Sequence, residues 1–339
     1  MKILQIGAGS MGTRRLRDLS ARPDVTLALL DERVDRRDRA HARFGIPTFG
    51  HLADAMAWQP EALVISTPPG TKDDYVQLAL AHRLHHFIEA DIWVRNAAEI
   101  SRLSAERHLV SAPSGSFEFL PVTKALATRV RDELGTLLCY QASMSTYMPE
   151  WHATEGLEYY ARHRNTTAAR EMIPFELHWL NARFGAPLEV AGNFEKFGRL
   201  PYDFEDTWTL SMRLASGGTG QLALSMACPV SSRRGTCFGT DAVITWDIFS
   251  GDLTVQRTGE TTARRENFGP TTAVLEPSYA DEIGTFVDAC LGRKPWPQSY
   301  EASQRSSATL AAAERSFLTG KWERVDPALD PERDLPRRS

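Results

Sequence analysis

The sequence predicts an α/β protein with a doubly wound parallel sheet first and then an α/β domain with an open, largely antiparallel sheet. Over residues 1–120, short apolar runs alternate with helical patterns, which is typical of a parallel sheet with helices on both faces. A glycine pattern joins the first apolar run to the first helix. Beyond Pro121, successive strand-like runs joined by short turns indicate an antiparallel sheet faced by helices.

The glycine pattern lies between an apolar run over residues 3–6 and a helical pattern over residues 13–19. Gly7 allows a sharp turn, Gly9 lets a pyrophosphate approach the backbone, and Gly12 lets helix and strand pack closely. The N–H groups of the helix N-terminus would hold the phosphates. This predicts an N-terminal Rossmann domain. The residues expected to bind the cofactor through this turn are Gly7, Ala8, Gly9, Ser10, Met11 and Gly12.

A second strand, over residues 25–30, ends at Asp31, where a dinucleotide fold places its ribose-binding acid. The Asp31 carboxylate would accept both ribose hydroxyls and repel a 2′-phosphate, which favours NAD. Arg33 leaves NADP possible, because an arginine there could accommodate that phosphate. The alternative is a glycine turn in a nucleotide-free protein, with Asp31 as a turn former.

Two further strands end in candidate site residues. The apolar run over residues 62–66 leads into Thr67 and Pro68, and the run over residues 86–89 ends in Glu89. Parallel sheets bind ligands at the carboxyl ends of their strands, so these three residues are expected beside the cofactor. Helices are predicted over residues 34–44, 51–58, 71–82 and 96–108.

The second half predicts one domain over residues 121–325, after a Rossmann domain over 1–120 and before a loosely held tail over 326–339. Its strongest helix, residues 171–184, is expected to start near Pro174, because a first turn tolerates proline. Arg233 and Arg234 precede Gly235 and are expected in a solvated turn. The other predicted helices are 122–134, 155–162, 279–290 and 301–318, and the strands are 137–147, 188–197, 207–214, 220–227 and 242–249.

Composition and charge argue against several classes of protein. The chain has 339 residues, 42% hydrophobic and 24% charged, and a net charge of −4, which gives no sign of a nucleic-acid partner. No apolar run is long enough to span a membrane, and the N-terminus enters a strand at once, as expected without a signal peptide. The four cysteines form no C-x-x-C pair, so neither a disulfide framework nor a metal site is expected. A cytoplasmic protein with reduced thiols is predicted.

Taken together, these motifs resemble the glucose–fructose oxidoreductase, inositol dehydrogenase and rhizopine-catabolism family (Gfo/Idh/MocA). The motifs are the glycine turn, residues 64–69, the strand ending at Glu89, the helix with His178, and residues 312–321. The resemblance implies a Rossmann domain, an open sheet that forms an oligomer interface, and NAD(P)-dependent oxidation or reduction of a sugar, cyclitol or related polyol.

The chain also departs from the family's usual pattern. The resemblance implies a lysine after Glu89, where this chain has Ala90, and two acids flanking His178, where it has Pro174 and Asn181. Three further substitutions replace an asparagine, a histidine and an arginine of the family by Pro69, Lys72 and Glu118. The resemblance therefore implies the family's fold and cofactor for this chain, but only part of the family's catalytic residues.

His178 remains as the proton-transfer residue that the resemblance implies, since a histidine titrates near neutral pH. Asn181 shares its helix face and could orient the imidazole or bind a substrate hydroxyl. The alternative is that His178 is a core histidine. Glu89 is a second catalytic candidate that could contact the nicotinamide ribose or the substrate, and the alternative is a salt-bridged structural acid.

A polar and aromatic segment resembles one in sugar-processing members of the family. Its aromatic rings could pack on sugar C–H groups while its His and Arg bind hydroxyls or an anionic group. The alternative is a surface loop with core aromatics. The substrate-binding candidates there are Trp151, His152, Tyr160 and Arg164.

The resemblance also predicts a homo-oligomer formed through the outer face of the second sheet. Leu222, Leu224 and Met226 recur at period two, and both faces of that strand are poor in charge, so both are expected to be covered. Two alternatives to a net dehydrogenase remain open. One is an enzyme that oxidises and re-reduces a sugar transiently during elimination or hydrolysis. The other is a non-catalytic dinucleotide-binding regulator.

Overall fold

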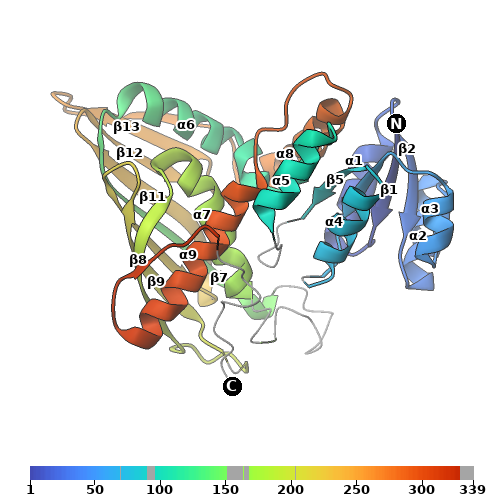
Figure 1. Cartoon of the computed structure of the whole chain (residues 1–339). Helices are drawn as coiled ribbons and strands as arrows, with labels where there is room; N and C mark the ends of the chain where they lie inside the picture. Colours follow the sequence, from blue (N-terminus) through green and yellow to red (C-terminus); the bar gives the residue numbers. More distant parts are fainter. Residues whose placement is uncertain (69, 90–95, 151–162, 164–167, 203, 329–339) are drawn as a thin grey trace. The chain divides into compact units, whose positions relative to one another are not determined.

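Two sheets of different kinds organise the chain (Figure 1). The computed structural model describes residues 1–68, 70–89, 96–150, 163, 168–202 and 204–328. Residue contacts divide the chain into a first compact unit, Met1–Ser116 with Glu276–Ser303, and a second, Phe117–Leu275 with Gln304–Ser339. By its contacts Glu276–Ser303 belongs to the first unit, although it lies within the predicted second domain over residues 121–325.

The sheet of the first unit is parallel throughout and has the strand order β3-β2-β1-β4-β5-β6. This is the doubly wound order that reverses beside the first strand. Its strands are β1 Lys2–Ile6, β2 Thr26–Leu30, β3 Thr48–Phe49, β4 Ala62–Ile65, β5 His85–Ile88 and β6 Ser111–Pro113. Its helices are α1 Ser10–Ser20, α2 Val34–Phe44, α3 Leu52–Ala57, α4 Lys72–Ala81, α5 Ala97–Glu106 and most of α8 Thr271–Cys290.

Both faces of this sheet are covered. Along β1, Leu4 and Ile6 belong to one apolar cluster and Ile3 to the other, as the alternation of side chains in a strand requires. The first cluster includes residues of α3, α4 and α5, and the second includes residues of α1, α2 and α8. The continuous apolar run of β4 is fully buried, as predicted for a strand with both faces covered.

The second unit has a nine-stranded sheet in the order β14-β13-β12-β11-β7-β10-β9-β8-β15. Every pair is antiparallel except β7 with β10, which is parallel. Its strands are β7 Leu137–Tyr147, β8 Pro187–Glu195, β9 Thr207–Leu214, β10 Thr219–Ser225, β11 Ala227–Gly239, β12 Ala242–Asp247, β13 Asp252–Arg257, β14 Arg264–Asn267 and β15 Glu323–Arg324. Its helical elements are α6 Pro121–Glu133, α7 Ala168–Phe184, most of α9 Tyr300–Thr319, and the short turns η1 Ser116–Phe119 and η2 Met148–Glu150.

Helices cover one face of this sheet. Phe184 of α7 stacks on Tyr140 of β7 and Trp246 of β12, and Phe317 of α9 stacks on Phe194 of β8. The alternate residues face the other way, which we call the outer face; on the central strands they include Gln141, Ser143, Thr209, Ser211, Gln221, Ala223 and Thr236. The predicted fold class is confirmed, with a Rossmann sheet followed by a largely antiparallel one.

Three details differ from the prediction. Pro174 lies inside α7, which begins at Ala168, so the helix does not start at the proline. Arg233 and Arg234 lie within strand β11 and not in a turn. Leu222, Leu224 and Met226 are buried toward the helices and belong to the core, so they say nothing about cover on the outer face. The predicted helix over residues 155–162 lies outside the described residues.

Candidate functional site

The glycine turn has the geometry that its spacing predicts. Gly7 has φ +84°, and its N–H donates to the carbonyl of Leu30 at 2.8 Å. A side chain at Gly12 would stand 2.0 Å from the Gly7 carbonyl oxygen, so only glycine fits there. At Gly9 the nearest atom would be 4.0 Å away, so the backbone is open to a ligand. Helix α1 therefore begins on a turn that a phosphate can approach.

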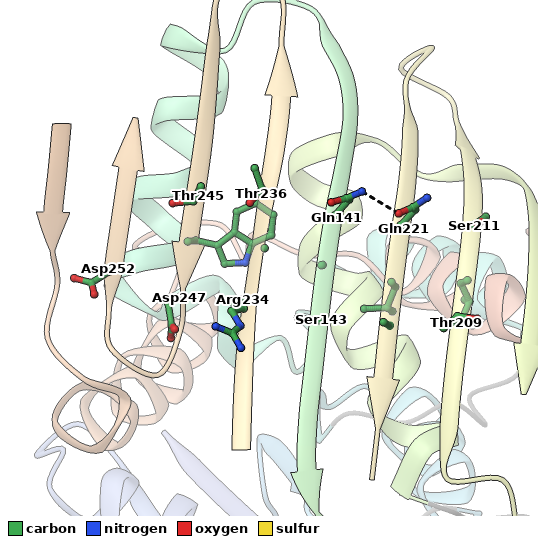
Figure 2. A pocket seen from close by; sticks show the side chains of 16 residues that line it. Gln141, Ser143, Thr209, Ser211, Gln221, Arg234, Thr236, Thr245, Asp247 and Asp252 are labelled. Atoms are coloured by element: carbon green, nitrogen blue, oxygen red, sulfur yellow. Dashed lines mark hydrogen bonds between the residues drawn. The ribbon is translucent and has the colours of Figure 1, made fainter. Parts of the chain in front are cut away.

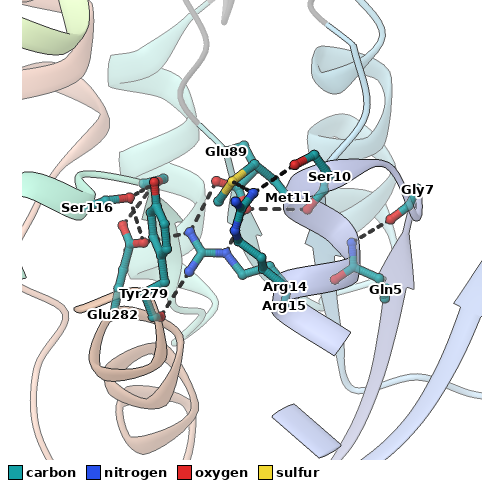
Figure 3. Close-up of polar contacts among 12 residues, drawn as sticks. Gln5, Gly7, Ser10, Met11, Arg14, Arg15, Glu89, Ser116, Tyr279 and Glu282 are labelled. Carbon is teal, nitrogen blue, oxygen red and sulfur yellow. Dashed lines mark hydrogen bonds and ion pairs between the residues drawn. The ribbon is translucent and has the colours of Figure 1, made fainter. Parts of the chain in front are cut away.

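The turn is braced from inside the sheet. The buried Gln5 amide donates to the carbonyl of Gly7 at 2.9 Å (Figure 3). Arg14, one turn into α1, donates to the Ser10 hydroxyl at 2.7 Å and to the Met11 sulfur at 3.6 Å. The N-cap residue of α1 is Gly9, which has no side chain to cap the first N–H groups, so a bound anion can accept hydrogen bonds from them.

Asp31 follows β2 and is buried beside this turn. Its Oδ2 accepts the N–H of Ala8 at 2.7 Å, and its Oδ1 accepts the N–H of Arg33 at 2.9 Å. Each carboxylate oxygen has further lone pairs, so two ribose hydroxyls can still be accepted. The strand end, the acid and the glycine turn thus form one arrangement, as the spacing predicted.

The arginine nearest to this acid is not the one that the sequence singled out. The Arg33 guanidinium forms a two-bond pair with Asp35, at 3.0 and 2.9 Å. Arg36, one turn into α2, instead lies 3.6 Å from the Asp31 carboxylate and faces the open space at Gly9. Sequence reasoning missed Arg36 because helix α2 carries several arginines that read as a solvated face.

The loop after β4 meets the glycine turn. A side chain at Gly7 would stand 2.7 Å from the Ser66 carbonyl oxygen and 3.5 Å from the methyl group of Thr67. The Thr67 hydroxyl accepts from Thr71 at 2.9 Å, and Thr71 also donates to the Pro68 carbonyl at 3.1 Å. The structure therefore brings the β1 and β4 loops together where the strand order reverses.

Glu89, directly after β5, is held by a buried arginine (Figure 3). Arg15 of α1 donates to both Glu89 carboxylate oxygens, at 2.7 and 3.1 Å. Its side chain is fully buried, and it also donates to Glu282 of α8 at 2.6 Å and to the Tyr279 carbonyl at 3.0 Å. This arrangement favours the salt-bridged reading of Glu89. A catalytic or ribose-binding role for Glu89 stays a prediction.

Glu282 completes this buried cluster. It accepts the N–H of Gly115 at 2.8 Å and the hydroxyls of Ser114 and Ser116 at 2.9 and 3.0 Å. Burial alone lowers the pKa of the Arg15 guanidinium, but the charges of Glu89 and Glu282 outweigh burial and hold that pKa above its ordinary value. The cluster therefore fixes the sheet edge at β5 by charge and hydrogen bonds together.

Helix α7 in the second unit presents His178 and Asn181 on one face. His178 is half-buried. Asn181 donates to the hydroxyl of Ser306 on α9 at 3.4 Å, and its buried carbonyl oxygen has no hydrogen-bond partner in the part of the chain that the structure describes. An unpaired buried acceptor of this kind suits a ligand hydroxyl.

The same helix supplies the buried acid that pairs with Arg233 and accounts for the position of its side chain. The Arg233 guanidinium lies 2.7 Å from the Glu176 carboxylate and over the ring of Phe117, 4.4 Å from its centroid. Burial raises the pKa of Glu176, against the opposing effect of the Arg233 charge. Trp179 and Phe184 of the same helix are core residues. Arg233 is therefore a core ion-pair residue.

Four predicted substrate-binding residues lie outside the described residues, and so does Ala90; the four are Trp151, His152, Tyr160 and Arg164. Glu118, at the position of a family arginine, pairs with Arg183 of α7. Within the described ranges no group of three His, Cys, Asp or Glu side chains could hold a metal ion. No helix among those same residues is long and apolar enough to cross a membrane.

The residues of the glycine turn fit a dinucleotide. Open space at Gly9, an uncapped helix N-terminus and a buried acid with spare lone pairs supply what pyrophosphate and ribose need. These features sit at the carboxyl edge of the parallel sheet, beside the strand that separates its two halves.

Comparisons with known proteins agree with this geometry. A family model described as "Oxidoreductase family, NAD-binding Rossmann fold" matches residues 1–112, and one described as "GFO/IDH/MocA C-terminal domain" matches residues 124–245. No curated protein matches.

Several solved structures share the fold across both units. GenD2 from gentamicin A biosynthesis, in complex with NAD, is 22% identical with a TM-score of 0.78, covering 96% of each chain. UDP-N-acetylglucosamine 3-dehydrogenase GnnA from Acidithiobacillus ferrooxidans is 21% identical with a TM-score of 0.76, covering 94% of this chain and 99% of that one. Levoglucosan dehydrogenase, in complex with NADH and levoglucosan, is 14% identical with a TM-score of 0.83, covering 96% and 99%. At these identities the likeness shows the fold.

Proposed function

Because the chain belongs to the Gfo/Idh/MocA oxidoreductase family, we propose that it is an NAD-dependent oxidoreductase acting on a hydroxyl or keto carbon of a sugar, cyclitol or sugar derivative. The observation that carries this proposal is the glycine turn with Asp31 hydrogen-bonded to it through Ala8. Support comes from two of the structural neighbours, a UDP-N-acetylglucosamine 3-dehydrogenase and a levoglucosan dehydrogenase in complex with NADH and levoglucosan.

A bound nicotinamide would supply hydride transfer to or from the carbinol carbon. The chain's own residues bind and orient the reactants. The N–H groups at the start of α1 hold the pyrophosphate, and Asp31 accepts the ribose hydroxyls. His178 takes the hydroxyl proton as the carbinol carbon becomes a carbonyl, so hydride and proton together account for the two hydrogens lost.

Substrate contacts are proposed for the aromatic and polar segment with Trp151, His152, Tyr160 and Arg164, and for Asn181. The unpaired carbonyl oxygen of Asn181 supports a substrate contact there, since a sugar hydroxyl would satisfy it.

A reducing cytoplasmic location is consistent with the four cysteines, none of which is in a disulfide.

A substrate panel tests the function. We would incubate the protein with NAD⁺ and with levoglucosan, myo-inositol, glucose and UDP-N-acetylglucosamine, and follow absorbance at 340 nm together with product analysis. Net NADH formation matched by a carbonyl product supports the dehydrogenase. Product without net NADH supports transient redox chemistry, and tight NADH binding without any turnover supports the regulator.

We propose further that the protein is a homo-oligomer joined through the outer face of the second sheet. That face has a cavity of about 720 Å³ lined by small polar side chains such as Ser143, Thr209 and Ser211 (Figure 2). Gln141 and Gln221 are hydrogen-bonded to each other across it at 3.2 Å. Arg234, Asp247 and Asp252 add charges of both signs along the β11–β13 side of this cavity. Such a face can pair with a second copy of itself, because two-fold symmetry brings the same side chains together from both partners.

A further inference from the structure

A buried lysine lies at the carboxyl edge of the parallel sheet. Lys72 is the first residue of α4, directly after the loop that follows β4. It is only 3% exposed, and its Nζ donates to the carbonyl oxygen of Glu89 at 3.3 Å. Glu89 is itself the first residue after β5. The ammonium group therefore sits between the ends of two adjacent strands.

Burial of an ammonium group is costly, so a lysine seldom becomes buried without a reason. Another lysine of the first unit shows what a purely structural contact looks like. Lys2 begins β1, at the opposite edge of the sheet, and donates to the Trp58 carbonyl at 3.2 Å while remaining half-buried. Lys72 makes the same kind of bond, but at the edge where such sheets bind ligands.

The expected orientation of the cofactor shows which half of the dinucleotide lies at this edge. A doubly wound sheet binds the two nucleotide halves on its two halves of three strands. Asp31 follows β2, so the adenosine half belongs to the β1–β3 side and the nicotinamide half to the β4–β6 side. Lys72 and Glu89 lie at the ends of β4 and β5, on the nicotinamide side. The sequence offers no cation directly after Glu89, where it has Ala90.

Building on the function proposed above, we propose that Lys72 supplies the positive charge at the nicotinamide end of the cofactor site. The oxidised nicotinamide ring is cationic and the reduced ring is neutral, so the ammonium disfavours the oxidised cofactor relative to the reduced one. It also stabilises the negative charge that grows on the substrate oxygen while the hydroxyl proton leaves.

Cofactor binding tests the location without any substrate. The dissociation constants of NAD⁺ and NADH would be measured by calorimetry for wild type, Lys72→Met, Lys72→Arg and the matched control Lys2→Met. Removal of the charge should tighten NAD⁺ relative to NADH by about three- to tenfold, the size expected of a nearby like charge partly screened by solvent. Lys72→Arg and Lys2→Met should keep the wild-type ratio.

Turnover tests the role. On the fastest substrate of the panel, Lys72→Met should lower kcat by about 10²-fold with a much smaller change in KM, because the charge acts on the transition state. Lys72→Arg should recover most of this loss. Lys72→Gln keeps a donor for the Glu89 carbonyl and replaces Lys72→Met if that variant does not fold.

The two proposals fail in different ways. If neither cofactor binds wild type, the proposed function is lost. If both cofactors bind wild type and the NAD⁺ to NADH ratio is unchanged in a folded, uncharged Lys72 variant, Lys72 is a structural tie and this inference is overturned.

Discussion

Asp31 and Arg36 place opposite charges close together at the ribose end of the cofactor site. The carboxylate would meet a 2′-phosphate with like charge, at a cost of about a few kcal/mol in a partly desolvated pocket. Arg36, 3.6 Å from that carboxylate and 27% exposed, offsets only part of the cost. We therefore expect NADH to bind more tightly than NADPH.

Fluorescence titration with both reduced cofactors measures this preference. Asp31→Asn should narrow the gap between them, and Arg36→Ala should widen it by about tenfold, the worth of one charge-assisted contact. Arg39→Ala is the control, since Arg39 lies on the same helix and pairs with Asp35 in solvent. Equal affinities in wild type, or tighter NADPH, would defeat the assignment of Asp31.

His86 in β5 makes the first unit sensitive to acid. Complete burial lowers the pKa of its imidazole to about 4, while Ser111 keeps one ring nitrogen hydrogen-bonded at 2.9 Å. The folded pKa lies below the unfolded value of 6.5, so below pH 6.5 the unfolded chain binds a proton that the folded one does not. The contribution of the neutral His86 to the free energy of unfolding is therefore complete above pH 6.5 and is lost as pH falls toward 4.

The expected loss attributable to His86 at pH 5 is about 2 kcal/mol. Urea unfolding at pH 7 and pH 5 should show that much less pH dependence in His86→Gln than in wild type. The exposed His82→Gln variant is the control. The same pH dependence in wild type and His86→Gln would show that His86 is not the source of the acid sensitivity.

At the scale of elements, helix α8 stabilises the first unit through one buried acid. Glu282→Gln would leave Arg15 with half of its compensating charge in a fully buried place. Breaking such a pair costs about 3–5 kcal/mol. Glu276→Gln, on the same helix but 42% exposed, breaks a surface pair with Arg14 and Arg17 and should cost at most about 1 kcal/mol. Equal losses of unfolding free energy in urea would contradict the cluster's role.

The glycine turn could be predicted because its geometry is written in local spacing: Gly7, Gly12 and Asp31 stand at distances along the chain that the strand–turn–helix unit requires. The return of helix α8 to the first unit could not be predicted. Glu282 lies 267 residues from Arg15, and nothing in a helical pattern tells which sheet it will cover.

Charged residues were the least predictable part of the site. Arg233 before a glycine reads as a turn, yet the long partner strand β7 and the buried Glu176 draw it into β11. Pro174 reads as a helix start, although proline can also lie inside a helix when packing holds it, as in α7. Lys72 and Arg36 gave no local signal, because their importance arises from strand ends brought together in space.

At the scale of the whole molecule, the outer sheet face predicts self-association. Light scattering coupled to gel filtration at micromolar concentration should give a mass that is a multiple of 37.8 kDa. Ala223 and Ser143 are register partners at the centre of that face, so Ala223→Arg should place repelling charges there and dissociate the assembly. Thr128→Arg, at a partly exposed position of α6 one turn after the exposed Lys124, should leave the mass unchanged. A monomeric wild type would exclude this interface.

We propose above that the chain is an NAD-dependent dehydrogenase with His178 as its proton acceptor. The direct measurement is steady-state absorbance at 340 nm for wild type and His178→Asn on the best substrate of the panel. We expect net NADH formation in wild type and a fall in turnover of about 10²- to 10⁴-fold in the variant, with unchanged NADH affinity. Wild type that binds NADH yet turns over no panel member, or a variant with near-normal turnover, would contradict it.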